Sequence, residues 1–170
     1  LVLLAKTDVE LEAVRDLPKV CEHFNVPVQS GSNSVLARMR RGYTVAEYRE
    51  KVALIGSRMP DAAISTDVIV GFCGETAAEF RETCDLLSDI RFDKVHVAAY
   101  SERPGTIASR RLADDVTEGV KKERLHAVEE LEAEIAGGIN ARLEGTDQEV
   151  LVEGRREGRW FGRSRSNKLV

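Results

Sequence analysis

The chain has 170 residues, of which 42% are hydrophobic and 32% are charged. This balance is typical of a globular domain and excludes an intrinsically disordered chain, and no apolar run is long enough to span a bilayer. The net charge of −4 is uneven, because residues 155–170 hold six basic residues and one acid, which leaves −9 for the first 154. An acidic body with a basic end predicts an anionic partner for that end, although a solvated charged face is the commoner reason for a charge run.

The cysteines indicate the compartment. There are three, Cys21, Cys73 and Cys84, and their spacing is irregular. This pattern favours reduced thiols over a disulfide framework. The apolar start, Leu1–Ala5, lacks the basic flank of a signal peptide. We therefore expect a cytoplasmic protein with no membrane partner.

Apolar and helical patterns alternate from the start of the chain. Leu1–Ala5 reads as a strand, and residues 9–17 have apolar side chains at helical spacing. A second short strand is predicted at 24–28. It leads into a polar turn at 29–33 and then into a short helix over 34–41.

Two capping boxes mark the next helix starts. Thr44 and Glu47 have the capping-box spacing, and so do Thr76 and Glu79. Between them, the β-branched run Val68–Val70 is typical of a strand that is covered on both faces. A strand, a glycine turn and a helix are therefore predicted in immediate succession.

The helix predicted over 76–90 is followed by a strand at 94–100, which continues the alternation expected of a parallel α/β fold. Polar loops follow three predicted strands, at Gln29, Gly71 and Ser101. The carboxyl ends of parallel strands meet at one rim, and ligands bind there. The sequence therefore predicts a ligand site built from these three loops, although an ordinary turn also accounts for the Gly71 loop alone.

The pattern changes in the last third of the chain. A long, charged helix starts at Thr117 and is predicted to end near Gly137 or to continue to Leu143. Two strands are predicted at 148–152 and 159–161. Two strands are too few for a stable β module, so we expect this module to be incomplete.

Four motifs, in their order and spacing, resemble the radical S-adenosylmethionine methylthiotransferases. These motifs are Val26–Ser32, Met39–Thr44, Thr66–Phe72 and Tyr100–Thr106. Residues 150–154 and 162–170 are similar to the start of that family's C-terminal TRAM module. The resemblance implies an α/β fold. Residues 1–137 would form the C-terminal half of a partial, TIM-like (β/α) radical SAM barrel with its closing long helix, and 138–170 the start of a small all-β, OB-like TRAM module.

The resemblance also implies cofactors. The family uses S-adenosylmethionine and two [4Fe–4S] clusters, because side chains alone cannot activate an inert C–H bond. The family's cluster motifs are absent from this sequence, and its three cysteines lack cluster spacing. We therefore expect no metal site in this chain, cluster ligands outside it, and no activity for the chain alone. Cys73 stands where the family usually has proline, and a tolerated small residue is the simpler interpretation.

The same resemblance implies which residues hold S-adenosylmethionine. They are Gln29, Ser30, Gly31, Arg41, Thr66, Asp67, Val70, Gly71, Phe72, Tyr100 and Ser101. Arg41 would pair with the methionyl carboxylate, although an arginine at a helix end also binds free carbonyl groups. No catalytic side chain is predicted.

The substrate prediction rests on the basic tail. The family includes tRNA enzymes and an enzyme that modifies an aspartate of a ribosomal protein. The basic and aromatic end resembles the tRNA branch, which implies methylthiolation of N6-isopentenyladenosine beside the tRNA anticodon. The residues expected to contact substrate or RNA are Arg103, Gly105, Thr106, Arg163, Arg165 and Lys168. The alternatives are the ribosomal-protein enzyme and a non-catalytic RNA-binding fragment.

Overall fold

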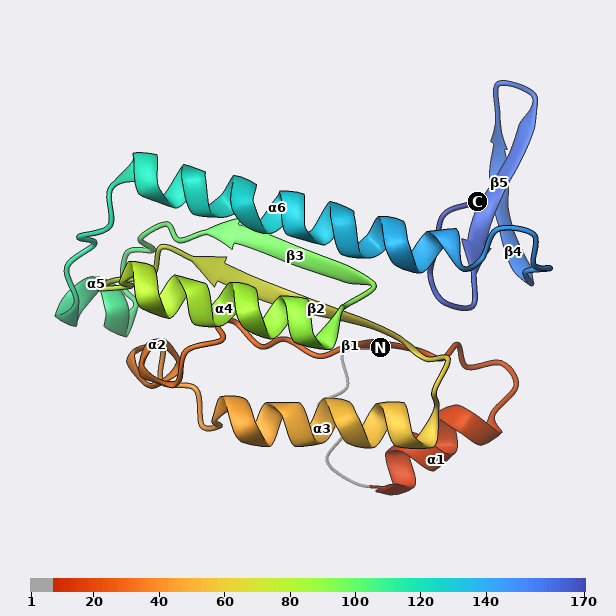
Figure 1. Cartoon of the computed structure of the whole chain (residues 1–170), viewed down its shortest axis with the longest axis horizontal. Helices are drawn as coiled ribbons and strands as arrows, with labels where there is room; N and C mark the ends of the chain where they lie inside the picture. The colour runs from red at the N-terminus through yellow and green to blue at the C-terminus, as the bar shows by residue number, and fades with distance from the viewer. Residues whose placement is uncertain (1–7) are drawn as a thin grey trace.

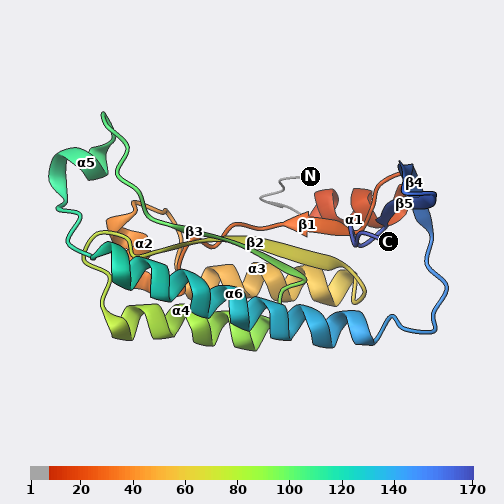
Figure 2. The same ribbon diagram turned by 90° about the horizontal axis from the view of Figure 1, so that it is seen from above.

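In the computed structural model, residues 8–170 are described. The strand expected at 1–5 lies outside these residues. The body is a three-stranded parallel sheet in the order β1 (His23–Asn25), β2 (Ala63–Val70), β3 (Lys94–Ala99). Helices α3 (Val45–Arg58), α4 (Ala77–Ile90) and α6 (Glu118–Ala141) lie together on one side of it (Figure 2). Figure 1 shows the strands running along the long axis toward the end where α2 (Asn33–Arg38) and α5 (Ile107–Arg111) lie. This arrangement confirms the predicted α/β class with parallel strands.

The three strands are β1 (His23–Asn25), β2 (Ala63–Val70) and β3 (Lys94–Ala99). β1 is shorter than the strand predicted at 24–28. Pro27 has no N–H to donate, so regular pairing stops before it. The chain rejoins the sheet at Gln29, which bridges to Val68. Gln29 has a φ of 70°, so the backbone turns away immediately afterwards.

The helices match the predicted order, with one addition. Their bounds are α1 Asp8–Asp16, α2 Asn33–Arg38, α3 Val45–Arg58, α4 Ala77–Ile90, α5 Ile107–Arg111 and α6 Glu118–Ala141. Both predicted capping boxes are confirmed, because Thr44 and Thr76 each exchange hydrogen bonds with the glutamate three residues later. Helix α5 was not predicted, since five residues are too few to show a helical period.

Helix α6 passes through the two glycines at 137 and 138, where the sequence left its end open, and ends at Ala141. Lys121, Arg124, Val128 and Ile135 are its buried residues. Their spacing of three, four and seven places them on one face, which packs against β3 and α4. Two charged residues therefore lie on the buried face of this helix.

The main core lies between the sheet and the helices. Its fully buried members include Phe24, Val68, Leu86, Leu87 and Val128, which come from β1, β2, α4 and α6. In β2, the even-numbered side chains Val68 and Val70 face this core, because successive side chains of a strand point to opposite faces. Ile69 points to the other face and lines a cavity there.

The C-terminal residues form an antiparallel hairpin of β4 (Val150–Arg156) and β5 (Arg159–Ser164), with a bulge between Val152 and Gly154. Both strands are longer than predicted. Figures 1 and 2 both place the hairpin at the end of the molecule opposite α2 and α5. No helix within residues 8–170 is both long and apolar enough to cross a membrane.

Candidate functional site at the carboxyl end of the sheet

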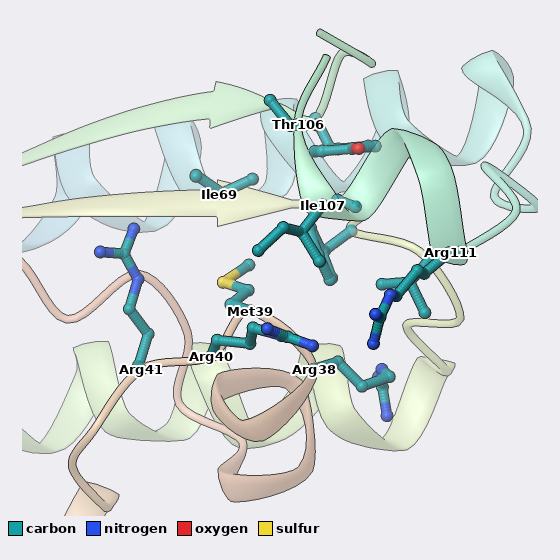
Figure 3. Close-up of a pocket in the computed structure, with 12 residues that line it drawn as sticks. Arg38, Met39, Arg40, Arg41, Ile69, Thr106, Ile107 and Arg111 are labelled. Carbon is teal, nitrogen blue, oxygen red and sulfur yellow. The ribbon is translucent and has the colours of Figure 1, made fainter. Parts of the chain in front are cut away.

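A cavity of about 410 Å³ lies where β2 and β3 end, between α2 and α5 (Figure 3). Its volume is in the range of small-molecule sites. Its wall is mainly apolar, and arginines are its only charged lining residues. The lining residues are Arg38, Met39, Arg40, Arg41, Ile69, Phe72, Tyr100, Thr106, Ile107, Ala108, Arg111 and Leu112.

Two aromatic rings form part of the wall. Tyr100 meets Phe72 edge to face, with ring centroids 4.9 Å apart, a favourable aromatic geometry. The amide of Tyr100 donates to the carbonyl of Val70, which fixes the end of β3 beside β2. Burial raises the pKa of Tyr100 to about 12. The phenol is therefore neutral at physiological pH, and the wall carries no negative charge from it.

The turn after β2 is held from behind by a buried ion pair. The amide of Gly71 donates to Oε2 of Glu75 at 2.7 Å, and Arg124 of α6 reaches the same oxygen at 2.7 Å. Burial raises the pKa of Glu75, although the Gly71 amide and Arg124 act in the opposite direction. Within the described part of the chain, Oε1 of Glu75 is the only buried side-chain polar atom without a hydrogen-bond partner.

Lys121, one helical turn before Arg124 in α6, lies against the same turn at Gly71. Its side chain is 1% exposed, and its ammonium pairs with Asp114 at 2.7 Å and Glu118 at 2.9 Å. Burial opposes its charge, but the hydrogen bonds to these carboxylates outweigh burial and raise the pKa of Lys121. The ammonium also lies 5.6 Å from the ring centre of Tyr100. Lys121 therefore joins α6 to the cavity wall from outside the cavity.

The arginines around the cavity differ in their partners. Arg38 makes a bidentate pair with Glu79 of α4 and also donates to the carbonyl of Cys73. Arg40, Arg41 and Arg111 are exposed. No ion pair to any of these three is found among residues 8–170. In Figure 3, Arg38, Arg40 and Arg111 lie on one side of Met39, and Arg41 lies on the other side.

Of the predicted cofactor residues, the structure brings Arg41, Phe72 and Tyr100 together at this cavity, along with the predicted substrate residue Thr106. Thr66 and Val70 do not line it. They are fully buried on the helix-covered face, where the Thr66 hydroxyl donates to the carbonyl of Val26 at 2.8 Å.

The predicted Gln29–Ser30–Gly31 loop lies against α4. The amide of Gly31 donates to the Thr83 hydroxyl at 2.9 Å, and Ser30 contacts the same hydroxyl. A Cβ on Gly31 would lie 2.5 Å from the Glu82 carbonyl oxygen, so only glycine allows this approach. These contacts hold the loop beside the cavity without lining it.

The remaining predicted residues near this end are polar or exposed. Asp67 accepts a hydrogen bond from Asn25 at 3.0 Å. Ser101, Arg103 and Gly105 lie in the exposed segment that leads into α5. Ser101, Arg103 and Gly105 lie at the same end of the molecule as the cavity but do not line the cavity.

The predicted RNA-binding residues of the tail lie at the opposite end, and each pairs with an acid. Arg163 pairs with Glu153 at 3.3 Å, Arg165 with Glu22 at 2.7 Å, and Lys168 with Asp93 at 2.7 Å. The last two pairs connect the hairpin end of the chain to the body. The side chain of Lys168 is 17% exposed.

Sequence reasoning did not predict eight of the lining residues: Met39, Arg40, Ile69, Ile107, Ala108, Leu112, Arg38 and Arg111. The last two flank the cavity only because α2 and α5 meet there, which no local pattern shows. The sequence does indicate the burial of Lys121 and Arg124, because their spacing places them on the same helical face as Val128 and Ile135. Cations on such a stripe predict buried partners. No cluster of three or more potential metal ligands is found within residues 8–170.

Comparisons with known proteins match this chain in two ways. The model of the Radical SAM superfamily matches residues 3–87. Among curated proteins, a tRNA-2-methylthio-N(6)-dimethylallyladenosine synthase of Dehalococcoides mccartyi (strain CBDB1) is 49% identical over 160 residues, which are 94% of this chain and 38% of that protein. The protein of the same name from Chloroflexus aurantiacus is 48% identical over 96% of this chain and 36% of its own length.

A third relative of the same name, from Chlorobium luteolum, is 45% identical over 94% of this chain and 36% of its own length. The chain therefore spans less than two fifths of the length of these relatives. The matches cover both the sheet with its cavity and most of the C-terminal hairpin, since they extend over 94% of the chain or more.

Proposed function

We propose, from the premise that this chain belongs to the radical SAM superfamily, that it is the C-terminal part of a methylthiotransferase that modifies N6-isopentenyladenosine in tRNA. The observation that carries the proposal is the identity of 45–49% to relatives named tRNA-2-methylthio-N(6)-dimethylallyladenosine synthase. The cavity at the carboxyl end of parallel strands supports it, because ligands of α/β proteins bind at that end.

The proposed domain division is 1–137 for the barrel part and 138–170 for the start of a TRAM module. The continuous helix α6 crosses this boundary and ends at Ala141, and the hairpin begins at Val150. We propose that the hairpin is the first piece of the TRAM module.

The cavity residues fit S-adenosylmethionine. Its adenine is flat and apolar on both faces, and Phe72, Tyr100 and Ile69 offer an apolar wall of suitable kind. Its carboxylate requires a cation, and Arg41 is exposed at the same cavity. When bound, S-adenosylmethionine together with a [4Fe–4S] cluster supplies the radical chemistry that activates an inert C–H bond.

The side chains of this chain then have binding and shielding roles. Phe72, Tyr100 and Ile107 exclude water from the cavity wall. Tyr100 stays neutral because its pKa is raised to about 12 by burial. Glu75 and Arg124 keep the Gly71 turn in place from behind. In this proposal, the cluster ligands come from sequence outside this chain, and the working enzyme is cytoplasmic with tRNA as its partner.

The test uses the full-length protein that contains this chain. It is reconstituted with iron and sulfide, supplied with S-adenosylmethionine and a reductant, and offered isopentenylated tRNA or ribosomal protein in separate reactions. Mass spectrometry should detect the methylthio group on the tRNA nucleoside only. Product on the ribosomal protein alone would assign the chain to the other branch. RNA binding without any product would favour the non-catalytic alternative.

A further inference from the structure

Positive charge gathers without compensation around the cavity at the carboxyl end of the sheet. We define the arginine rim as Arg40, Arg41 and Arg111, the lining arginines for which no ion pair is found among residues 8–170. We propose that Arg40 and Arg111 bind backbone phosphates of the RNA whose target base approaches S-adenosylmethionine at the cavity. This inference rests on the proposed function and assigns the phosphate contacts to this end of the molecule.

The acids near the rim are engaged elsewhere. Glu79 forms the bidentate pair with Arg38 and closes the capping box of α4. Asp115 accepts from the amide of Gly74 at 2.6 Å, and Asp114 pairs with Lys121. None of these three acids pairs with a rim arginine. Like charges in one place repel one another, and an anion bound between them removes that cost.

The backbone at Arg40 gives a second observation. Its φ is 58°, in the left-handed region where a side chain costs free energy and glycine is the usual residue. Gly42, two residues later, has no positive φ. The amides of Arg40 and Arg41 donate to the carbonyls of Ala37 and Leu36, so Arg40 is the left-handed residue that caps the end of α2, and this cap places an exposed cation at the cavity.

The arrangement of the rim separates two tasks. Figure 3 shows Arg40 and Arg111 on the same side of Met39, with Arg41 on the other side. Arg41 is thereby left for the carboxylate of S-adenosylmethionine. In that view, Arg40, which follows α2, and Arg111 of α5 point toward one another, an arrangement that suits a polyanion bound between these two helices.

Two basic residues of the tail are weaker candidates for these contacts. Arg165 and Lys168 are held in ion pairs of 2.7 Å with Glu22 and Asp93. The hairpin also lies at the end of the molecule opposite the cavity. A nucleotide whose base approaches S-adenosylmethionine at the cavity has its own phosphates near the rim, because a phosphate is only one sugar away from its base.

The experiment measures binding of an isopentenylated anticodon stem-loop RNA to the full-length protein by fluorescence anisotropy over a range of salt concentrations. The double variant Arg40→Gln, Arg111→Gln is compared with the double variant Arg81→Gln, Arg142→Gln. The control removes two exposed arginines that do not line the cavity. Affinity for S-adenosylmethionine is measured in parallel by equilibrium dialysis.

We expect the rim variant to lower the slope of log affinity against log salt by about 1.4 to 1.8, as two lost phosphate contacts require. Affinity at low salt should fall by about tenfold or more, while the control keeps the wild-type slope. Affinity for S-adenosylmethionine should not change. Arg40→Gly should also weaken RNA binding without unfolding the protein, because glycine suits the left-handed backbone.

A wild-type slope for the rim variant, with tRNA still bound and modified, would overturn this inference alone. So would a loss of S-adenosylmethionine affinity with RNA binding unchanged, because the rim would then serve the cofactor. If the wild-type protein modifies ribosomal protein and ignores the stem-loop, the proposed function fails and this inference fails with it.

Discussion

Gly71, in the turn between β2 and α4, has no room for a side chain. Its φ is 70°, and a Cβ there would lie 2.4 Å from Cγ of Lys121. Alanine would therefore meet two penalties, the strain of the left-handed backbone and a clash with a buried side chain. Lys121 cannot move aside freely, since its ammonium is held by two carboxylates.

The matched control for this residue is Gly105, which has a φ of 85° but no atom within 4 Å of the place that a Cβ would take. Gly105→Ala should lower the free energy of unfolding by about 1–2 kcal/mol through backbone strain alone. Gly71→Ala should cost about 1–3 kcal/mol more because of the clash. Urea unfolding of the two variants measures the difference. Equal losses would show that Lys121 relaxes without cost.

At the scale of elements, Glu79 ties α2 to α4. Its carboxylate closes the capping box with Thr76 and also accepts hydrogen bonds from Arg38 and Ser34 of α2. Glu47 of α3 closes an equivalent box with Thr44 but has no arginine partner among the described residues. The two helices therefore provide a natural comparison of one cap with and without a link to a second helix.

The link makes stability depend on pH. The hydrogen bond from Arg38 is the main cause that lowers the pKa of Glu79 to about 2 from the ordinary value of 4.5. The folded state thus favours the ionised carboxylate. This stabilisation is complete above pH 4.5 and is lost as the pH falls toward 2.

Glu79→Gln should therefore remove part of the acid dependence of unfolding. The loss at neutral pH should be about 1–2 kcal/mol after allowance for solvent screening, with little difference from wild type near pH 2. Glu47→Gln should lower stability by less than Glu79→Gln, as expected for a cap alone. Thermal unfolding between pH 2 and pH 7 checks both variants. Parallel curves for wild type and Glu79→Gln would contradict the role of the Arg38 pair.

At the scale of the whole molecule, ionic contacts attach the hairpin segment to the body. Arg165 makes a bidentate pair with Glu22 and donates to the carbonyls of Pro18 and Val20. Lys168 pairs with Asp93, which precedes β3. The hydrogen bond from Arg165 lowers the pKa of Glu22. The apolar side chains of Leu151 and Trp160 are exposed, so the attachment relies on polar contacts rather than on a shared core.

Arg165→Met should release the hairpin while the sheet stays folded. Amide hydrogen exchange should become faster in residues 150–170 by about tenfold or more, because several charge-assisted hydrogen bonds are lost together. The amides of β2 should keep their protection. Arg159→Met serves as the control, since Arg159 lies beside the hairpin turn, away from these contacts. Unchanged exchange in both variants would show that other contacts hold the hairpin.

The sequence by itself determined where the main helices and strands begin and in which order they follow one another. Capping boxes and strand patterns depend on residues only a few positions apart. The helix starts at Thr44 and Thr76 and the strand at Val68–Val70 could therefore be predicted without knowing which distant residues pack against them. The prediction that loops after parallel strands form one site also follows from order alone. Phe72 and Tyr100 meet at the cavity, whereas the loop at Gln29 packs against α4 and does not line it.

Only the tertiary structure decided which side chains reach the cavity and which are used elsewhere. Strand alternation and helix packing turn Thr66 into the core and leave Ile69 at the cavity. The pairs Arg38–Glu79, Glu75–Arg124 and Glu22–Arg165 join residues 41, 49 and 143 positions apart. Such partners depend on the packing of distant elements, which no local pattern records. For this reason, the sequence located the basic residues, but the structure showed which of them pair with acids among residues 8–170.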